Sequence, residues 1–211
     1  MASNLEKYLE GLKFRVYGIV QDASSFNNDN GEMQRMVRIS TSGKMFSLFV
    51  NTDEELNKYG SLVGSFVLCS GRVTRMKNSA SVSCRLESVI SKGQPGWSDP
   101  SATDLVVGCV VEGVVALERK SSGVREGRPY STLMFKAMGD VFEVKNVPTG
   151  IYAGLPEDRS SMIAVRFLVD YGLGWDGGTS ARFSEMRLSI TEFRILPPDM
   201  AEGKPSREKA A

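Results

Sequence analysis

The sequence predicts an all-β fold with short helices, arranged as two similar halves. Apolar runs rich in Val, Ile, Phe and Tyr recur along the chain, which is typical of strands. A strand pattern at 44–50, a short helix pattern and a long strand pattern at 65–76 stand in succession, and Gly71 interrupts the last. A glycine inside a strand indicates a bulge or bend. A long bent strand is what a small closed barrel needs to join both of its sheets.

The short helix is predicted from its start signals. Thr52 stands three residues before Glu55, which is the spacing of a capping box. Asp53 and Glu54 suit the positive end of a helix dipole. Gly60 is expected to end the helix in a left-handed conformation.

The remaining elements of the first half follow from hydrophobic alternation and from turn residues. Residues 3–10 predict a helix that either packs on the barrel or serves self-association. A polar loop is expected at 22–31, and a tight turn at 41–43 makes the second and third strands a hairpin. The other strands are expected at 14–21, 32–40 and 81–90.

After a segment rich in Gly, Pro and Ser, the same order of elements returns. Trp97 in this segment is expected to latch onto one half. Gly108 in Val106–Val110 is matched to Gly18 in Val16–Val20. Loops are expected at 119–128 and 172–178, and a shorter segment at 148–155 takes the place of the capped helix. The strands of this half are expected at 105–118, 129–138, 140–147, 161–171 and 182–196.

Composition restricts the chemistry. The chain has no His, so the commonest general base and metal ligand is missing, and neither an enzyme nor a metal or cofactor site is expected. Cys69, Cys84 and Cys109 lie in apolar runs and read as buried thiols. Residues 1–98 carry 12 Lys and Arg against 9 Asp and Glu, and residues 99–196 carry 11 against 13. Attraction to nucleic acid must therefore be local.

No signal peptide or membrane span is evident in the sequence. We therefore expect a cytoplasmic protein, and a phage-encoded origin is compatible with this expectation.

This order of elements, with a glycine in the first strand and a long bent fourth strand, resembles the OB-fold, a five-stranded Greek-key barrel. The predicted organisation is two such barrels in tandem. A pair of OB-fold barrels is similar to single-stranded nucleic-acid-binding proteins of bacterial or phage replication, or of the replication protein A kind. The ending Lys204–Ala211 lacks the acidic, Phe-terminated tail of bacterial members. The predicted divisions are 1–92 for the helix and first barrel, 93–104 for a linker, 105–198 for the second barrel and 199–211 for a mobile tail.

The resemblance places a ligand on strands two and three, between the 1–2 and 4–5 loops. Binding without sequence preference needs cations for phosphates and exposed rings for bases. The alternative is that the rings belong to the core and the charges form a solvated face. Trp175 is expected to cover a base, the other half or another subunit. The candidates in the first half are Tyr17, Arg35, Arg38, Lys44, Phe49, Arg72, Arg75 and Lys77, with Phe46 taken as core. Those in the second half are Arg119, Lys120, Arg125, Arg128, Tyr130, Tyr171 and Trp175.

The expected function is non-sequence-specific binding of single-stranded DNA in replication, recombination or repair, with RNA as an open alternative. The partners would be DNA and, further, another copy of the chain or a replication protein. The competing hypothesis is a non-enzymatic adaptor subunit of a larger assembly, because the net charge is near neutral and the second half is acidic.

Overall fold

The computed structural model describes most of the chain. The predicted helix at 3–10, Trp97 with its linker, Lys77 and the tail lie outside the described residues. No described helix is long and apolar enough to cross a membrane. The described residues are 11–28, 30–41, 43–76, 81–93, 108–138, 140–157, 161–176 and 181–197.

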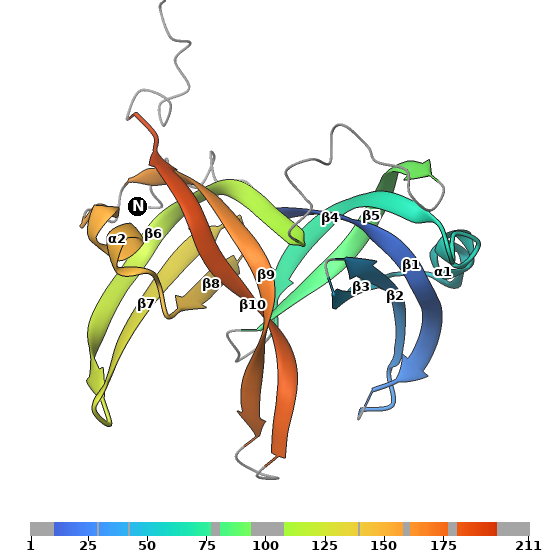
Figure 1. Ribbon diagram of the computed structural model, residues 1–211, viewed down its shortest axis with the longest axis horizontal. Coiled ribbons are helices and arrows are strands. Elements are labelled where there is room, and N and C mark those ends of the chain that lie inside the picture. The colour runs from blue at the N-terminus through green and yellow to red at the C-terminus, as the bar shows by residue number, and fades with distance from the viewer. Residues whose placement is uncertain are drawn as a thin grey trace, which may run out of the picture.

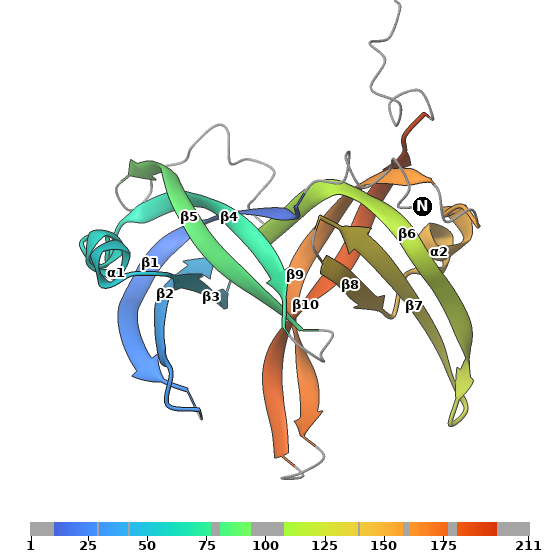
Figure 2. The same ribbon diagram turned by 180° about the vertical axis from the view of Figure 1, so that it is seen from behind.

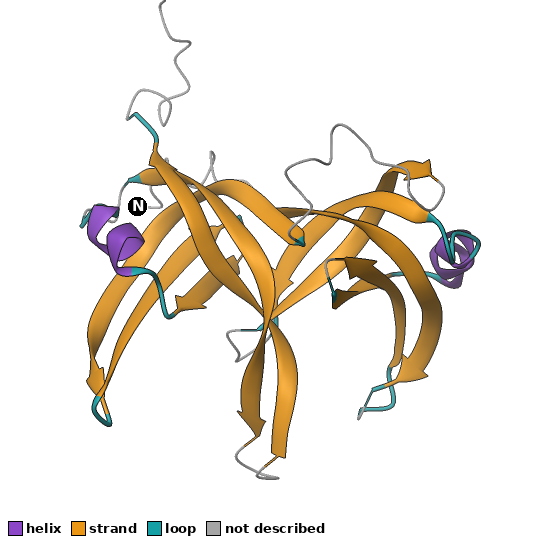
Figure 3. Ribbon diagram, in the orientation of Figure 1, coloured by secondary structure: helices purple, strands orange, loops and turns teal. Residues whose placement is uncertain are grey.

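Strands dominate the fold, and two short helices lie at its outer flanks (Figure 3). Both halves contain the predicted order of three strands, a helix and two strands. The first half consists of β1 (Lys13–Asn27), β2 (Met33–Thr41), β3 (Lys44–Val50), α1 (Asp53–Gly60), β4 (Phe66–Arg75) and β5 (Val82–Gly93). The second half consists of β6 (Cys109–Arg125), β7 (Arg128–Ala137), β8 (Asp140–Lys145), α2 (Thr149–Gly154), β9 (Met162–Asp176) and β10 (Ala181–Ile195).

The first half is a closed five-stranded barrel. β1 pairs with β2 and β4, β5 pairs with β4, and β3 pairs with β2 and, in parallel, with β5. The barrel order is therefore β1-β2-β3-β5-β4, the pairing of an OB-fold. Phe14, Val16 and Phe46 fill the interior and are fully buried. Burial of Phe46 confirms its assignment to the core.

The second half repeats this pairing with one step missing. β6 pairs with β7 and β9, β7 pairs with β8, and β9 pairs with β10. Between β8 and β10 no hydrogen-bonded ladder occurs within the described residues. Phe135, Phe142 and Phe167 form its buried core. This half is thus a five-stranded sheet of the same order that stays open along one seam.

The two halves are joined by main-chain pairing. β1 and β6 run antiparallel from the pair Lys13–Glu112 to the pair Val16–Cys109, so ten strands form one sheet. One cluster of buried side chains continues through both halves. The sequence did not predict this contact, because alternation reveals the buried face of a strand but not the neighbour at its edge.

Three long hairpins, β1–β2, β6–β7 and β9–β10, extend to the same side of the molecule (Figures 1 and 2). The expected loops at 22–31, 119–128 and 172–178 are wrong over most of their length, because strand pairing continues through them. The pairs Asn27–Met33, Arg125–Arg128 and Asp176–Ala181 end these hairpins. Polar residues tolerate a strand here, since the ladder supplies the main-chain hydrogen bonds.

Gly71 lies at a bulge, as predicted. The register of β4 against β5 shifts just before it. A Cβ at Gly71 would lie 1.9 Å from the carbonyl oxygen of Arg85 and 2.8 Å from the ring of Phe14. Gly71 is opposite Phe14 on β1, whereas Phe167 on β9 is opposite Val111 on β6. Each half thus places one ring at this pair of strands, and in the first half glycine makes room for it.

The predicted equivalence of Gly18 and Gly108 is wrong. Gly18 lies inside β1, where a Cβ would lie 2.3 Å from the carbonyl oxygen of Ser40. Gly108 precedes β6 and has a φ of +136°. The bulges give the correct alignment, because β1 shifts register just before Asp22 and β6 just before Arg119. We call the extended hairpins β1–β2 and β6–β7 the β1–β2 arm and the β6–β7 arm. Asp22 and Arg119 therefore occupy matching positions on these two arms.

The cap at the start of α1 is confirmed, with one change of partner. The Thr52 hydroxyl accepts from the N–H of Glu55 at 3.1 Å, and the Glu55 carboxylate accepts from the N–H of Asn51 at 2.8 Å. The expected left-handed end at Gly60 is wrong. The chain continues in turns to Gly64, which has a φ of +85° and donates its N–H to the carbonyl of Val20 at 2.8 Å.

Candidate nucleic-acid interface

The outer face of β2 and β3 carries both cations and exposed apolar groups. Alternation turns Ile39 and Phe46 into the barrel and turns Arg38, Met45 and Phe49 outward. Phe49 is half-buried, Met45 is exposed, and Arg38 lies opposite Ser47 in the register. The neighbouring Arg85 of β5 donates to the side chain of Asn51. We call Arg38, Met45, Phe49 and Arg85 the β2–β3 face.

Several predicted cations of the first half are paired with carboxylates. Arg38 lies 3.2 Å from Asp22, and Arg72 lies 2.5 Å from Glu87. Each pair is partly exposed, so its contribution to stability is small.

Arg35 lies on the opposite side of β2 from Arg38, toward α1. It binds both carboxylate oxygens of Asp53, at 2.6 and 3.1 Å. The hydrogen bond from Arg35 lowers the pKa of Asp53. This pair anchors the start of α1 to β2 and takes Arg35 away from the β2–β3 face.

Arg72 and Arg75 do not share a face. The sequence required a bulge between them if both were to point outward, but the shifts in β4 lie before Arg72. Arg72 is exposed and Arg75 is half-buried at the end of the strand. Because strand residues alternate, these two arginines leave on opposite sides of the sheet.

Tyr17 packs on the outside of β1, away from the β2–β3 face. Its ring is stacked on Phe66 with centroids 5.8 Å apart. It also contacts a small buried cluster made by Leu68 and Val110, with Leu168 beside it. Tyr17 thus covers the junction of the two halves.

A second junction joins β9 to the turn between β2 and β3. Lys44 lies 2.8 Å from Asp170, and its hydrogen bond lowers the pKa of that carboxyl. The hydroxyl of Tyr171 donates to the carbonyl oxygen of Met45, and its ring lies 5.7 Å from that of Phe46. Desolvation raises the pKa of Tyr171. Lys44 and Tyr171 therefore fasten the halves together.

The β6–β7 arm presents the exposed candidates. Arg119 and Arg128 are exposed and make no ion pair within the described residues. Tyr130 is 42% exposed, and its ring lies across Gly123, where a Cβ would lie 3.0 Å from the ring.

Lys120 differs from the other cations of this arm because it is enclosed. Its side chain is 10% exposed and lies 2.7 Å from Glu157 and 4.8 Å above the ring of Tyr152. The side chains of Arg125 and Trp175 lie outside the described part of the structure. Trp175 lies within β9, opposite Arg182, and not in the expected loop.

Two hollows meet at Asn146. The first, the arm hollow, has a volume of about 570 Å³ and lies between the β6–β7 arm and α2. Tyr130, Tyr152, Ser131 and Thr149 are among its lining residues. The second, the seam hollow, has about 180 Å³ and lies along the open seam, lined by Lys145, Arg187 and Tyr171 among others. Asn146 lines both hollows.

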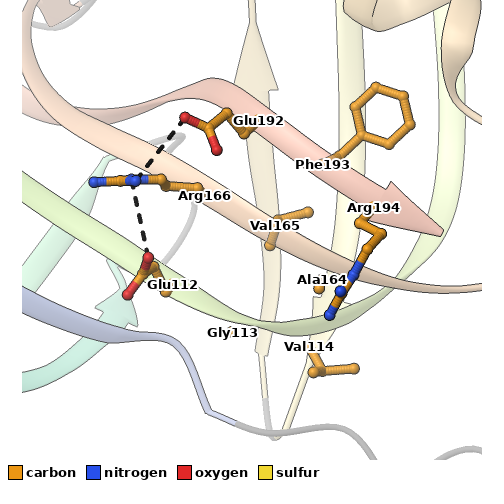
Figure 4. A pocket seen from close by; sticks show the side chains of 9 residues that line it. All are labelled: Glu112, Gly113, Val114, Ala164, Val165, Arg166, Glu192, Phe193 and Arg194. Carbon is orange, nitrogen blue, oxygen red and sulfur yellow. Dashed lines mark ion pairs between the residues drawn. The ribbon is translucent and has the colours of Figure 1, made fainter. Parts of the chain in front are cut away.

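A third hollow, of about 460 Å³, lies on the outer surface of β6, β9 and β10 (Figure 4). Arg166 stands there between Glu112 and Glu192, at 3.9 Å from each. Arg15 of β1 lies 2.9 Å from Glu112. This row of alternating charges follows the register across the strands and stabilises the sheet. Its carboxylates make it a poor site for phosphates.

Sequence reasoning missed Arg85, Asn146 and Tyr152. Arg85 stands in an alternating strand pattern, and its placement beside β3 depends on a parallel pairing of distant segments. Asn146 has a φ of +56°, which asparagine adopts more readily than most residues. Asn146 before Val147 and Pro148 is a local signal for a turn, whereas the apolar pattern predicts a strand through residue 147 and β8 ends at Lys145.

No group of three potential metal ligands occurs among the described residues. The three cysteines are buried and free, as predicted. Burial raises the pKa of Cys69 to about 12 and that of Cys109 well above its ordinary value. The thiols of Cys69 and Cys109 therefore remain protonated and unreactive at neutral pH.

Comparison with known proteins identifies the fold. The chain superposes on a deletion mutant of the single-stranded DNA binding protein from Thermus aquaticus with a TM-score of 0.53 and 12% identity, covering 96% of this chain and 100% of that one. The wild-type protein from the same organism gives a TM-score of 0.50 and 10% identity, with 97% of each chain covered. No protein-family model matches the sequence, and no curated protein matches it. At this identity the likeness shows a shared fold.

Proposed function

We propose that this protein binds single-stranded DNA without sequence preference, in replication, recombination or repair. The proposal rests mainly on how much of the chain superposes on a protein of known structure. It runs through both halves, and the matched protein is a single-stranded DNA binding protein. The placement of cations and rings on the β2–β3 face and the β6–β7 arm supports the same function, because phosphates need cations and unpaired bases need flat rings.

In the proposed organisation, residues 1–92 and 105–198 are two OB-fold units that act in tandem. Residues 93–104 link them, and residues 199–211 form a tail. The repeated strand pairing supports this division. The second unit has the strand order of the first but stays open at the seam between β8 and β10 in the described residues. The chain acts by binding, without a catalytic step, metal or cofactor, in the cytoplasm.

The proposed path of the strand begins at the exposed Arg128 and Tyr130, passes Asn146 and the seam hollow, and crosses to the β2–β3 face. Lys44 and Tyr171 hold the crossing point together. Cations along this path stand beside carboxylates such as Asp22 and Asp170. Binding therefore relies on exchange of intramolecular pairs for phosphates and on stacking, so we expect moderate affinity that depends on salt.

The test is a titration of the full chain with labelled oligo-dT at two salt concentrations. Affinity is expected to fall as salt rises, with a slope of about −0.7 in log K against log salt for each phosphate contact. A duplex of the same length is the control and should compete poorly. Absence of affinity at low salt would refute the proposal. A defined oligomer or protein complex indifferent to DNA would favour an adaptor subunit, and equal or tighter binding of oligo-U would point to RNA.

A further inference from the structure

The arm hollow has the form of a site for one flat, uncharged group. Its lining contains Tyr130, Tyr152 and Asn146 with serines, a threonine and apolar residues, and no acid or basic side chain. A volume of about 570 Å³ lies within the range of sites that take small ligands. A phosphate would find no cation inside it, so a neutral ring is the better occupant.

Two positions of the hollow point to recognition. Tyr130 keeps 42% of its surface exposed although Gly123 lies beneath its ring. One face of this ring is thus supported by the arm and the other is open. Asn146 is held with a φ of +56°, its N–H donating to the carbonyl of Ser131 at 2.8 Å. Its side-chain amide makes no hydrogen bond within the described residues, and it can donate and accept at once.

Cations stand on both sides of the hollow. Arg128 precedes the lining residue Pro129 at the tip of the arm, and Lys145 precedes Asn146 at the end of β8. Arg128 is exposed and without an ion pair in the described part, and Lys145 lies 3.6 Å from Glu143, a loose contact. A neutral hollow flanked by two cations matches the alternation of a nucleotide chain, in which an uncharged base is flanked by phosphates.

We propose that the arm hollow holds one unpaired base of the bound strand, stacked on Tyr130 with its edge hydrogen-bonded by the amide of Asn146. This inference rests on the proposed function and adds to it a defined contact for a single base. Tyr152, fixed beneath Lys120 by a cation–π contact at 4.8 Å, forms the far wall. Stacking accepts every base, and one amide can pair with the edge of several, so the site fits binding without sequence preference.

The test uses the full chain and a short oligo-dT that carries 2-aminopurine, whose fluorescence is quenched when it stacks. Tyr130→Ala is expected to lower affinity about 5- to 150-fold, the range of one base–aromatic stack, and to relieve quenching. Tyr130→Phe keeps the ring and is expected to keep both. Asn146→Gly removes the amide without straining the left-handed backbone and is expected to cost about 2- to 12-fold, as for one hydrogen bond.

Met138→Ala is the matched control. Met138 is 63% exposed beyond the other end of β7, outside the hollow, and its replacement is expected to change affinity less than about twofold. An abasic oligonucleotide of equal length tests the contact independently of folding. It should bind the wild-type chain more weakly than oligo-dT by a factor that shrinks in Tyr130→Ala.

The outcomes separate the two proposals. If the wild-type chain has no affinity for oligo-dT, the proposed function fails and this inference fails with it. If the wild-type chain binds but Tyr130→Ala binds equally well and leaves 2-aminopurine quenched, the inference alone is overturned. An equal penalty for the abasic strand in both chains would also overturn it.

Discussion

Removal of the carboxylate of Asp22 should tighten DNA binding. Asp22 forms an ion pair at 3.2 Å with Arg38, one of the two cations of the β2–β3 face, and the position that matches Asp22 in the β6–β7 hairpin is Arg119. Both members of the pair have side chains about two-fifths exposed, so the pair is worth about 0.2–1 kcal/mol. In Asp22→Asn, Arg38 no longer exchanges one anion for another when a phosphate arrives. Affinity should therefore rise about 1.4- to 5-fold.

The assay is fluorescence anisotropy with labelled oligo-dT at about 50 and about 200 mM salt, because affinity should differ enough between these concentrations to give the salt slope. Arg38→Gln, the reverse change, should weaken binding and reduce the slope by about 0.7. Asp53→Asn is the matched control. It releases Arg35, which leaves β2 on the opposite side from Arg38, so affinity should not change.

Two results would refute the reasoning. Weaker binding by Asp22→Asn would mean that the carboxylate shapes the face instead of competing with phosphate. Unchanged binding by Arg38→Gln would mean that the strand does not cross the β2–β3 face at all.

Three further outcomes concern the fold. Gly71→Ala should destabilise the chain by about 3 kcal/mol in urea unfolding, because its Cβ would lie 1.9 Å from a carbonyl oxygen; a loss below about 1 kcal/mol would contradict that packing. Gly60→Ala should stabilise by about 0.5–1 kcal/mol, since its Cβ meets only ordinary contacts, whereas Gly64→Ala, at φ +85°, should cost about 1–2 kcal/mol; melting temperatures in the reverse order would show that the left-handed residue is Gly60 and not Gly64. Because Lys44 lowers the pKa of Asp170, the pair stabilises the fold above about pH 4 and the effect falls away as the pH drops through the lowered pKa; Asp170→Asn should cost less than about 1 kcal/mol at pH 7 and progressively less in more acidic solution, and a loss that does not change with pH would exclude the ion pair as its cause.

The elements of the fold were predictable where local chemistry decides them. Thr52 and Glu55 gave the start of α1, and Gly71 gave the bulge of β4. The position of the left-handed residue after α1 was not predictable, because it is Gly64, where a main-chain hydrogen bond to Val20 of β1 fixes the turn. Long-range pairing decides that position, and no local pattern records it.

The candidate site was predicted in part for the same reason. Residue type identified Arg128 and Tyr130 as exposed groups, and Arg38 as a partly exposed one, on suitable strands. It could not show that Lys120 is enclosed, since its partner Glu157 lies 37 positions away along the chain. The role of Tyr171 at the junction depends likewise on a contact between the two halves.

Pairing of β1 with β6 has a consequence for the number of nucleotides that the proposed DNA strand would cover. The separation between the two halves is set by hydrogen bonds of the main chain from Lys13 to Val16, and not by the length of the segment that connects β5 to β6. The distance between the two halves is therefore fixed. A strand that spans it should cover the same number of nucleotides however many residues are inserted into that segment.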